Sequence, residues 1–469
     1  MKIAFLHYHL KTGGVTTVLQ QQINAVSPAC EVMLLTGEMP ESTGSIETRS
    51  IPGIGYDIPG GILHDPGQVA DAVVNAIFDC WPDGCDILHV HNPTLAKNRN
   101  FLKILKALQG RGITLFLQIH DFAEDGRPQA YFHGEEYPVD CHYGVINSRD
   151  YNILLKCGLK KRGLHRVFNT ITPLPRKDHR AVAEYVLYPV RAIRRKNIGE
   201  ALLLSLFLPH GESLQISLPP NSPMDRESYN DWKRFVKTHR LTVGFEAGLQ
   251  NDFSDLVCHA RFLITTSITE GFGFAFLEPW TADKMLWGRR LPDICHDFEK
   301  AGINLDHLYS SIRIPPDWID LKAFSTRRQS VFRAVCRRFD FHPRDDDIRQ
   351  ALSVIATGGR IDFGLLDEKF QRRVLSLIIE NKQARRELIR INPFLAEPGY
   401  VKNPDELIRK NRAAVLDTYN EAGYTDNVLG VYRKIIEKPV THRIDRQLLL
   451  RCFMQPNRFS LLKWSDYAR

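Results

Sequence analysis

The sequence contains no apolar run that approaches the roughly 20 residues needed to cross a bilayer. Its longest candidate, Ala201–Pro209, is predicted to form part of a buried helix instead. An apolar signal segment is also lacking, because only Ile3–Leu6 lie between Lys2 and His7. We therefore expect a soluble, cytoplasmic protein without a transmembrane segment, for which peripheral contact with a membrane stays open.

The sequence also lacks C-x-x-C pairs and a large net charge of either sign. The nine cysteines are scattered without a C-x-x-C pair, so we expect buried reduced thiols and neither a disulfide framework nor a zinc site. No other metal site and no bound cofactor is expected. The net charge of +8 over 469 residues is mild, and the basic clusters carry no interleaved aromatic residues. Nucleic acid is therefore not an expected partner, whereas an anionic ligand agrees with the excess of positive charge.

What the sequence does contain is a regular alternation of strand and helix patterns. In the first part, the expected strands are Lys2–His7, Asp86–Val90, Ile113–Ile119 and Tyr143–Ile146. After the proline-rich, basic segment Thr172–Arg180 the expected strands are Glu184–Val190, Leu214–Leu218, Leu241–Phe245, Arg261–Thr266 and Lys284–Trp287. Strands that alternate with helices predict parallel sheets with right-handed crossovers.

This pattern predicts an α/β protein with two doubly wound domains, at residues 1–175 and 181–326. Residues 327–469 carry mainly helical patterns and are expected to form a helical extension that includes crossover helices. Two doubly wound domains that face each other place the carboxyl ends of their strands at one cleft. Because open sheets bind ligands at those ends, we expect the binding site there.

The most informative segment is Thr269–Glu278, TEGFGFAFLE, in which Glu270 and Glu278 stand eight positions apart. It follows the expected strand Arg261–Thr266, and a helix is expected to begin near Phe274. Such a helix start offers free N–H groups to a phosphate, while carboxylates suit the hydroxyl groups of a sugar or a ribose. The alternative interpretation is an ordinary glycine-rich helix entry with acids at the surface.

The spacing of these glutamates resembles the E-x7-E motif of retaining, nucleotide-sugar-dependent glycosyltransferases of the GT-B fold, most like glycosyltransferase family 4. Further segments within residues 1–291 follow the order of that family's motifs. They are Gly13-Gly14-Val15, Asp86–Asn92, His120-Asp121, Ser148, Val167–Asn169, the pair Arg191 and Lys196, and Val243-Gly244-Phe245. The resemblance implies two Rossmann-like domains facing a cleft, with the sugar donor held by the second domain.

The resemblance also implies a role for each matching residue. Arg191 and Lys196 are implied to neutralise the leaving diphosphate, which is electrostatic catalysis. Glu278 is implied to hold the ribose, Glu270 the donor sugar, and His120 to lie at the reacting centre. The other implied donor-binding residues are Gly14, Val15, Gly244, Phe245, Gly271, Phe272 and Gly273. Without the family match, the segment around Lys196 is an ordinary basic loop and His120 a buried core residue.

The acceptor is expected on the first domain, at loops such as Gly13–Thr16 and Asp121–His133. Basic side chains favour an anionic small molecule that is phosphorylated or carboxylated. The candidate acceptor-binding residues are Thr16, Asp121, Arg127 and Arg289, with Arg149 as a further cation. A lipid acceptor is the rival, because Asn98–Arg111 has the pattern of a basic amphipathic helix. Its apolar residues suit packing on the sheet equally well.

We therefore predict a retaining glycosyltransferase that moves a sugar from a nucleotide diphosphate donor to an acceptor whose identity the sequence leaves open. The alternatives are a nucleotide-sugar epimerase or a sugar phosphorylase of the same fold, or a non-catalytic protein that binds nucleotide sugars. A glycosidase is disfavoured, because its two carboxylates flank one glycosidic bond, whereas Glu270 and Glu278 flank a glycine-containing loop.

Overall fold

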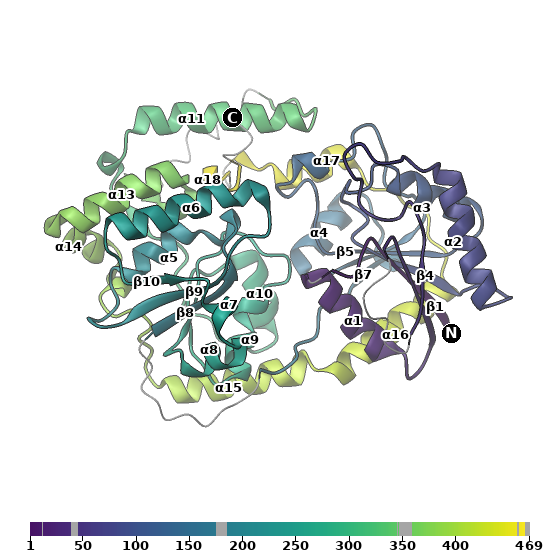
Figure 1. Cartoon of the computed structure of the whole chain (residues 1–469), viewed down its shortest axis with the longest axis horizontal. Helices are drawn as coiled ribbons and strands as arrows, with labels where there is room; N and C mark the ends of the chain where they lie inside the picture. The colour runs from purple at the N-terminus through teal and green to yellow at the C-terminus, as the bar shows by residue number, and fades with distance from the viewer. Residues whose placement is uncertain are drawn as a thin grey trace. The chain divides into compact units, whose positions relative to one another are not determined.

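The computed structural model describes residues 1–11, 13–38, 46–174, 185–344, 346, 359–456 and 459–464 (Figure 1). The chain divides into two compact units, each built from segments far apart in the sequence. Unit 1 comprises Met1–Thr170, Arg338–Phe341 and Tyr419–Met454, and unit 2 comprises Ile171–Arg337, His342–Thr418 and Gln455–Arg469. The first boundary, between Thr170 and Ile171, falls just before the expected linker.

A parallel sheet of seven strands forms the centre of unit 1, in the order β3-β2-β1-β4-β5-β6-β7. Its strands are β1 (Lys2–His7), β2 (Glu31–Thr36), β3 (Glu47–Ser50), β4 (Ile87–His91), β5 (Leu115–Ile119), β6 (His142–Val145) and β7 (Leu164–Arg166). Both β4 and β5 are buried along their whole length. This burial on both faces is what a parallel sheet covered by helices requires.

Helices cover the two faces of this sheet, as alternate residues of β1 demonstrate. The helices of unit 1 are α1 (Gly14–Val26), α2 (Pro66–Cys80), α3 (Phe101–Gly110), α4 (Ser148–Lys156), α16 (Glu421–Glu437) and α17 (Arg446–Phe453). Ile3 and Phe5 belong to a core with residues of α1 and α16, whereas Ala4 and Leu6 belong to a core with residues of α2 and α3. Successive side chains of a strand point to opposite faces, so each face has its own core.

Helix α3 decides between the two interpretations of the basic amphipathic segment. Its apolar residues Phe101, Leu102, Ile104, Leu105 and Leu108 are fully buried. They belong to the same core as residues of β1 and α2. Packing on the sheet is therefore confirmed, and this stripe is not available to a lipid surface.

The sheet of unit 2 has five parallel strands in the order β10-β9-β8-β11-β12. They are β8 (Tyr185–Arg191), β9 (Ser213–Leu218), β10 (Val243–Phe245), β11 (Leu263–Thr265) and β12 (Leu286–Gly288). The helices around it are α5 (Ile198–Ser205), α6 (Pro223–Thr238), α7 (Ala247–Gln250), α8 (Phe253–His259), α9 (Glu278–Thr281) and α10 (Pro292–Lys300). Both sheets thus have the doubly wound strand order that the alternation predicts.

The predicted helical extension, residues 327–469, is divided between the two units instead of forming a third. Unit 2 takes most of α11 (Leu321–Arg338) and all of α13 (Glu368–Glu380), α14 (Lys382–Ile391), α15 (Pro404–Thr418) and α18 (Leu461–Trp464), with a short antiparallel pair, β13 (Arg313–Ile314) and β14 (Ile361–Asp362). Unit 1 takes α16 and α17. None of the nine cysteines forms a disulfide, and five of them are buried as predicted, whereas Cys80, Cys85, Cys258 and Cys452 are half-buried. Within the described ranges, no helix combines the length and the apolar character needed to cross a membrane.

Candidate functional site

The basic segment predicted to bind the diphosphate lies at the end of β8 in unit 2. Arg191 is the last residue of β8, and a short 3-10 helix, η3 (Arg194–Lys196), follows it. Tyr188 Oη and Thr266 Oγ1 donate to the carbonyl oxygen of Lys196 at 2.6 and 2.9 Å. Because β8 and β11 are neighbours in the sheet, these bonds fix the basic segment against the chain that follows β11.

The two glutamates of the TEGFGFAFLE segment lie on that following chain. Glu270 is in the loop after β11, and Glu278 begins the short helix α9. The expectation of one continuous helix from Phe274 is wrong, because a separate 3-10 turn, η4 (Phe274–Phe276), precedes α9. Pro279 lies in the first turn of α9, and proline lacks the N–H that would continue a helix from the preceding turn.

Lys196 is the cation around which these acids gather. Its Nζ forms an ion pair with Glu270 Oε1, and Arg195 Nη1 lies 3.8 Å from Glu270 Oε2. Burial acts to raise the pKa of Glu270, but Lys196 and Arg195 outweigh it and hold that pKa below its ordinary value. Burial lowers the pKa of Lys196, and Glu270 opposes this. The structure therefore places two predicted donor-binding residues in one buried ion pair.

Glu278 is in a different electrostatic state. Burial raises the pKa of its carboxyl group to about 7, and Lys196 only partly opposes this. Glu270 is therefore ionised at neutral pH, while Glu278 is close to its titration midpoint. Since Lys196 acts on both carboxyl groups, the structure brings Lys196, Glu270 and Glu278 together as one cluster.

The basic residues of this segment have distinct environments. Arg191 is exposed, and no residue in the described part of the chain pairs with its guanidinium. Arg194 instead donates to Glu368 Oε1 at 3.2 Å, within unit 2. Arg195, which the sequence analysis did not single out, lies beside Glu270. The only sequence signal for Arg195 is its position between Arg191 and Lys196.

The predicted donor-binding residues Gly244 and Phe245 lie on the edge strand β10. Gly244 is held so close to β9 that an added Cβ atom would lie 2.0 Å from Gln215 Oε1. A side chain at position 244 would therefore require the flexible end of the Gln215 side chain to move. The ring of Phe245 is partly exposed and packs edge-on against Tyr229, with ring centroids 5.4 Å apart.

The loop Gly271–Gly273 presents backbone groups and not side chains to a ligand, because two of its residues are glycines and the third is buried. Phe272 is buried and packs on Phe298 at a centroid distance of 5.8 Å, so its ring belongs to the core of unit 2. Gly273 has a φ of +100°, which side-chain-bearing residues rarely adopt. A Cβ atom there would also lie 3.0 Å from Ile294 Cγ2. The conformation of this loop therefore depends on Gly273.

Arg289 was predicted to bind the acceptor, and the structure contradicts this. Its guanidinium is buried in unit 2 and donates to both oxygens of Glu200 and both oxygens of Asp362, at 2.6–2.8 Å. It also donates to the carbonyl oxygen of Ser310 at 3.1 Å. These bonds use all five N–H donors of an arginine. Arg289 is therefore the centre of a structural ion network and has no donor left for a ligand.

In unit 1, His120 lies directly after β5 and belongs to a cluster of buried histidines. Its Nε2 lies 3.0 Å from Nδ1 of His91, the last residue of β4. His91 stacks on His89 with centroids 4.6 Å apart, and the His7 ring lies 6.3 Å from His91. Burial lowers the pKa of His120 to about 4. Among the residues that the structure describes, no three side chains are arranged to hold a metal ion.

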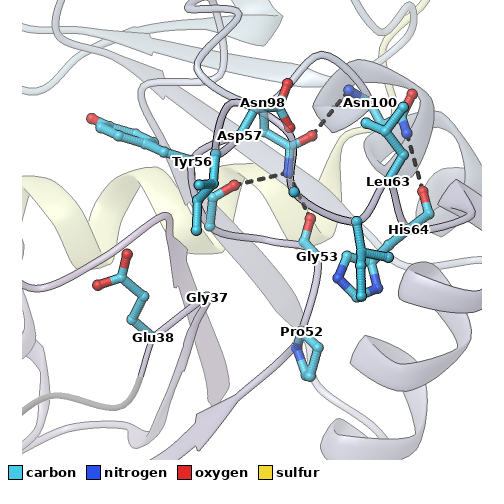
Figure 2. A pocket seen from close by; sticks show the side chains of 14 residues that line it. Gly37, Glu38, Pro52, Gly53, Tyr56, Asp57, Leu63, His64, Asn98 and Asn100 are labelled. Carbon is cyan, nitrogen blue, oxygen red and sulfur yellow. Dashed lines mark hydrogen bonds between the residues drawn. The ribbon is translucent and has the colours of Figure 1, made fainter.

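A cavity of about 350 Å³ opens in unit 1 among residues that follow β2, β3 and β4 (Figure 2). Asn98 Nδ2 donates to the carbonyl oxygens of Gly53 and Gly55 at 2.6 and 3.0 Å. Asn100 Nδ2 donates to the carbonyl oxygen of His64 at 3.0 Å. The carboxyl ends of parallel strands are where such sheets bind ligands. Asn98 and Asn100 were expected only as the start of an amphipathic helix, and the other lining residues have no sequence signal beyond the glycine and proline content of segment 52–61.

The predicted acceptor residues Asp121 and Arg127 form an ion pair, with Arg127 Nη2 2.9 Å from Asp121 Oδ1, and both lie close enough to Tyr56 to act on its pKa. Tyr56, which lines the cavity, has Lys97 Nζ 5.7 Å from its ring centroid. Burial lowers the pKa of Lys97, Arg127 adds to this effect, and Asp121 opposes it. The structure thus gathers two cations, Lys97 and Arg127, near one aromatic ring.

The predicted residues at the start of α1 are held by local contacts. Gly14, Val15 and Thr16 form the first turn of α1, and Thr16 Oγ1 donates to the carbonyl oxygen of Lys11 at 2.8 Å. The helix start leaves Gly14 exposed.

Arg149, the further cation predicted for the acceptor, forms ion pairs with two neighbouring carboxylates. Its Nη2 lies 3.1 Å from Asp125 and its Nε lies 2.8 Å from Asp150. These ion pairs place it in the framework of α4.

Comparison with known proteins gives one curated relative. No protein-family model matches the chain. The mannosylglucosyl-3-phosphoglycerate synthase of Petrotoga mobilis is 26% identical over 334 residues, which cover 62% of this chain and 65% of that protein. The match thus spans less than two thirds of the relative's length.

Solved structures of low sequence identity share the architecture. HepE from Anabaena in complex with UDP-glucose is 11% identical, with 92% of this chain and 98% of that chain covered and a TM-score of 0.53. Sucrose-phosphate synthase from Thermosynechococcus elongatus is 13% identical, with the same coverage and TM-score. A glycosyltransferase from Rickettsia africae is 10% identical, with 93% and 99% covered and a TM-score of 0.54.

At these identities the likeness concerns the fold. Membership of glycosyltransferase family 4 stays a prediction. The two doubly wound sheets and these structural neighbours establish that the chain has the GT-B fold of glycosyltransferases.

Proposed function

We propose that the chain is a retaining glycosyltransferase that transfers a sugar from a nucleotide diphosphate donor to an anionic small-molecule acceptor. The observation that carries this proposal is the convergence of Glu270 and Glu278 on Lys196 in unit 2. The exposed Arg191 begins the same basic segment.

Each group of this cluster has chemistry that suits one part of a nucleotide sugar. Arg191 and Lys196 supply positive charge to a diphosphate, whose negative charge grows as its bond to the sugar breaks. A guanidinium can bind two phosphate oxygens at once, whereas an ammonium acts as a point charge. Glu270 and Glu278 accept hydrogen bonds from the hydroxyl groups of the sugar and the ribose. Because an ammonium has three N–H donors, Lys196 can hold Glu270 and a phosphate oxygen together.

Retention of the anomeric configuration is part of the proposal, because the spacing of Glu270 and Glu278 resembles that of a retaining family. Both acids lie beside the cation assigned to the leaving phosphate, so neither is assigned as a nucleophile toward the sugar. In the proposed reaction the acceptor hydroxyl attacks the anomeric carbon from the side of the leaving diphosphate. An oxygen of that diphosphate accepts the hydroxyl proton.

The anionic character of the acceptor is supported by unit 1. Arg127 lies close enough to Lys97 to lower its pKa, and Asp121 acts on that pKa in the opposite direction. Tyr56 adds an aromatic wall to the neighbouring cavity. The curated relative carries 3-phosphoglycerate in the name of its product, which is an anionic group of the proposed class. We therefore place the acceptor's phosphate or carboxylate at Lys97 and Arg127.

The reaction is tested by incubating the chain with nucleotide sugars and candidate acceptors while nucleoside diphosphate release is followed. Release that requires an acceptor, with a product whose anomeric configuration by NMR equals that of the donor, supports the proposal. An inverted product contradicts the retaining mechanism. Isomerisation of the donor sugar, or binding without turnover, contradicts glycosyl transfer itself.

The acceptor assignment is tested with Arg127→Ala. Loss of a charge-assisted hydrogen bond should raise the KM for an anionic acceptor about 10- to 100-fold and leave the KM for the donor unchanged. Arg111→Ala is the matched control, because Arg111 pairs with Asp71 at 2.7 Å on the same unit. Equal acceptor KM values in the two variants would remove Arg127 from the acceptor site.

A further inference from the structure

The histidine cluster of unit 1 contains a contact that the proposed function has not used. His91 ends β4, and His120 follows β5, its neighbour in the sheet. Their rings are nearly parallel, at 14° with centroids 5.2 Å apart, and His91 Nδ1 lies 3.0 Å from His120 Nε2. At this distance one of the two nitrogens carries a proton and donates it to the other.

Both rings are neutral at physiological pH. Burial lowers the pKa of His120 to about 4, with Asp121 opposing, and lowers that of His91 well below its ordinary value, with His7, His89 and His120 adding to the effect. A neutral imidazole has one N–H and one bare nitrogen. Either His91 donates from Nδ1 or His120 donates from Nε2.

The other ring nitrogen of His91 distinguishes these two arrangements. His91 Nε2 is buried without a hydrogen-bond partner among the described residues. If His120 donated, the proton of His91 would have to sit on this Nε2 as an orphaned N–H, and such groups are rare in protein interiors. If His91 donates, its Nε2 is a bare nitrogen, and unsatisfied acceptors are tolerated more often than unsatisfied donors.

The backbone around His120 is held by the residue that follows His91. Asn92 Oδ1 accepts hydrogen bonds from the backbone N–H groups of His120 and Asp121 at 3.3 and 3.0 Å. The end of β4 thus fixes His120 twice, through its ring and through its backbone. The orientation of the His120 ring is therefore set by β4.

We infer that His91 is a positioning residue, which donates its Nδ1–H to His120 Nε2 and thereby keeps the proton of His120 on Nδ1. His120 then has no free basic nitrogen, because Nε2 is occupied and Nδ1 carries its proton. Toward a ligand at the end of β5 it acts as a hydrogen-bond donor and not as a general base. The expected effect on turnover rests on the proposed function, whereas the tautomer does not.

The tautomer is measured directly on the full chain labelled with 15N at histidine. Long-range 1H–15N correlation spectra at pH 7 separate protonated from bare ring nitrogens, and the signals that vanish in His120→Asn assign His120. We expect a protonated Nδ1 and a bare Nε2 on His120. A protonated Nε2 would overturn the inference, whether or not the chain transfers sugar. If His120→Asn does not fold, His120→Gln serves for the same assignment.

The role in turnover is tested with two substitutions at one position. His91→Leu removes the donor, whereas His91→Asn keeps an N–H close to the place of Nδ1. We expect His91→Leu to lose the Nδ1–H signature of His120 and to lower turnover at least roughly tenfold, with unchanged affinity for nucleoside diphosphate. His91→Asn should recover both the signature and the turnover.

A second histidine pair provides the matched control. His142 on β6 and His165 on β7 make the same Nδ1 to Nε2 contact at 2.9 Å, with stacked rings. His142→Leu should leave the His120 tautomer and turnover unchanged. If His91→Leu and His142→Leu lower turnover equally while the His120 signature persists in both, His91 is structural and the inference fails.

Discussion

Arg191 differs from Arg194 and Lys196, because its side chain is exposed and forms no ion pair with a described residue. Arg191→Ala should therefore leave the thermal unfolding midpoint unchanged while it lowers turnover by about 100-fold, because charge stabilisation of the diphosphate is lost. Steady-state kinetics and thermal unfolding measure the two effects. Arg226→Ala removes another exposed arginine of unit 2 and should leave turnover unchanged. Equal turnover in both variants would exclude Arg191 from the donor site.

The raised pKa of Glu278, about 7, predicts two opposite responses to pH. If ionised Glu278 binds the ribose, affinity for nucleoside diphosphate should increase as the pH rises from about 6 to 8. Stability should decrease as the pH rises from about 5 to 7, because an acid with a raised pKa binds its proton more tightly in the folded state. Calorimetric titration and thermal unfolding across this range measure both responses, and Glu278→Gln should abolish both.

Glu270 provides the comparison, because Lys196 and Arg195 hold its pKa below the ordinary value. Glu270→Gln should keep the affinity for free nucleoside diphosphate and its pH dependence, while turnover of the nucleotide sugar falls. If Glu270→Gln loses the nucleotide, or if the wild-type affinity does not change with pH, the roles assigned to the two acids are wrong.

From the ion network of Arg289 we expect that its substitution lowers the free energy of unfolding and leaves the KM for the acceptor unchanged. Arg289→Met leaves Glu200 and Asp362 without their cation, and loss of one partner from a buried pair costs about 3–5 kcal/mol. Urea unfolding should reveal this loss, and the combined variant Arg289→Met, Glu200→Gln, Asp362→Asn should regain part of it. Acceptor KM should stay at the wild-type value in whatever protein remains folded. A large increase in that KM would restore Arg289 as an acceptor ligand.

At the scale of elements, the loop between β11 and α9 depends on one backbone conformation. Gly273→Ala should destabilise the fold by about 1–2 kcal/mol for the left-handed conformation, with a further cost from the contact to Ile294. It should also lower turnover, because Glu270 and Glu278 flank this residue. Gly211→Ala, with a φ of +92° and open space around it, should show the backbone cost alone and normal turnover. Urea unfolding and kinetics of both variants test the difference.

The elements most open to sequence prediction were those with a strong local pattern. The strands around Phe116 and Leu187 are apolar runs in an alternating chain, and they appear where predicted. The continuous helix from Phe274 was wrong, because a new helix begins at Glu278 with Pro279 in its first turn. Arg289 failed for another reason. Its partners Glu200 and Asp362 are far away in the sequence, and no local pattern reveals a contact at that separation.

The same reason explains what was missed at the candidate sites. Lys196, Glu270 and Glu278 were found through a motif with fixed spacing, and the structure gathers them. Two contacts were not predicted: that of Lys97 with Tyr56 and that of His91 with His120. In each contact the two residues lie at or after the ends of different strands of the sheet. In the sequence each of them is an isolated residue near the end of a strand, and such residues belong to the core more often than to a functional site.

At the scale of the whole molecule, unit 1 should not fold from its first segment alone. Its core between β1 and α1 is completed by Tyr424, Val428 and Tyr432 of α16. A chain that ends at Thr418 should therefore lose hydrogen-exchange protection at β1 and β4. A chain that ends at Met454 retains every segment of unit 1 and should keep that protection. Equal protection of these strands in both truncated chains would contradict the assignment of α16 to this core.

Because α16 lies late in the sequence, the core of unit 1 stays incomplete for much of the time that the ribosome needs to synthesise the chain. The seven strands of unit 1 have emerged by Thr170, but α16 follows roughly 250 residues later, an interval of about 12–50 s at ordinary rates of translation. Throughout that time Ile3 and Phe5 lack α16, one of the two helices that cover them in the finished protein. The nascent chain is thus a natural client for chaperones that hold exposed apolar segments. Yield in a foreign host should depend on chaperone supply and on the speed of translation, even where the completed fold is stable.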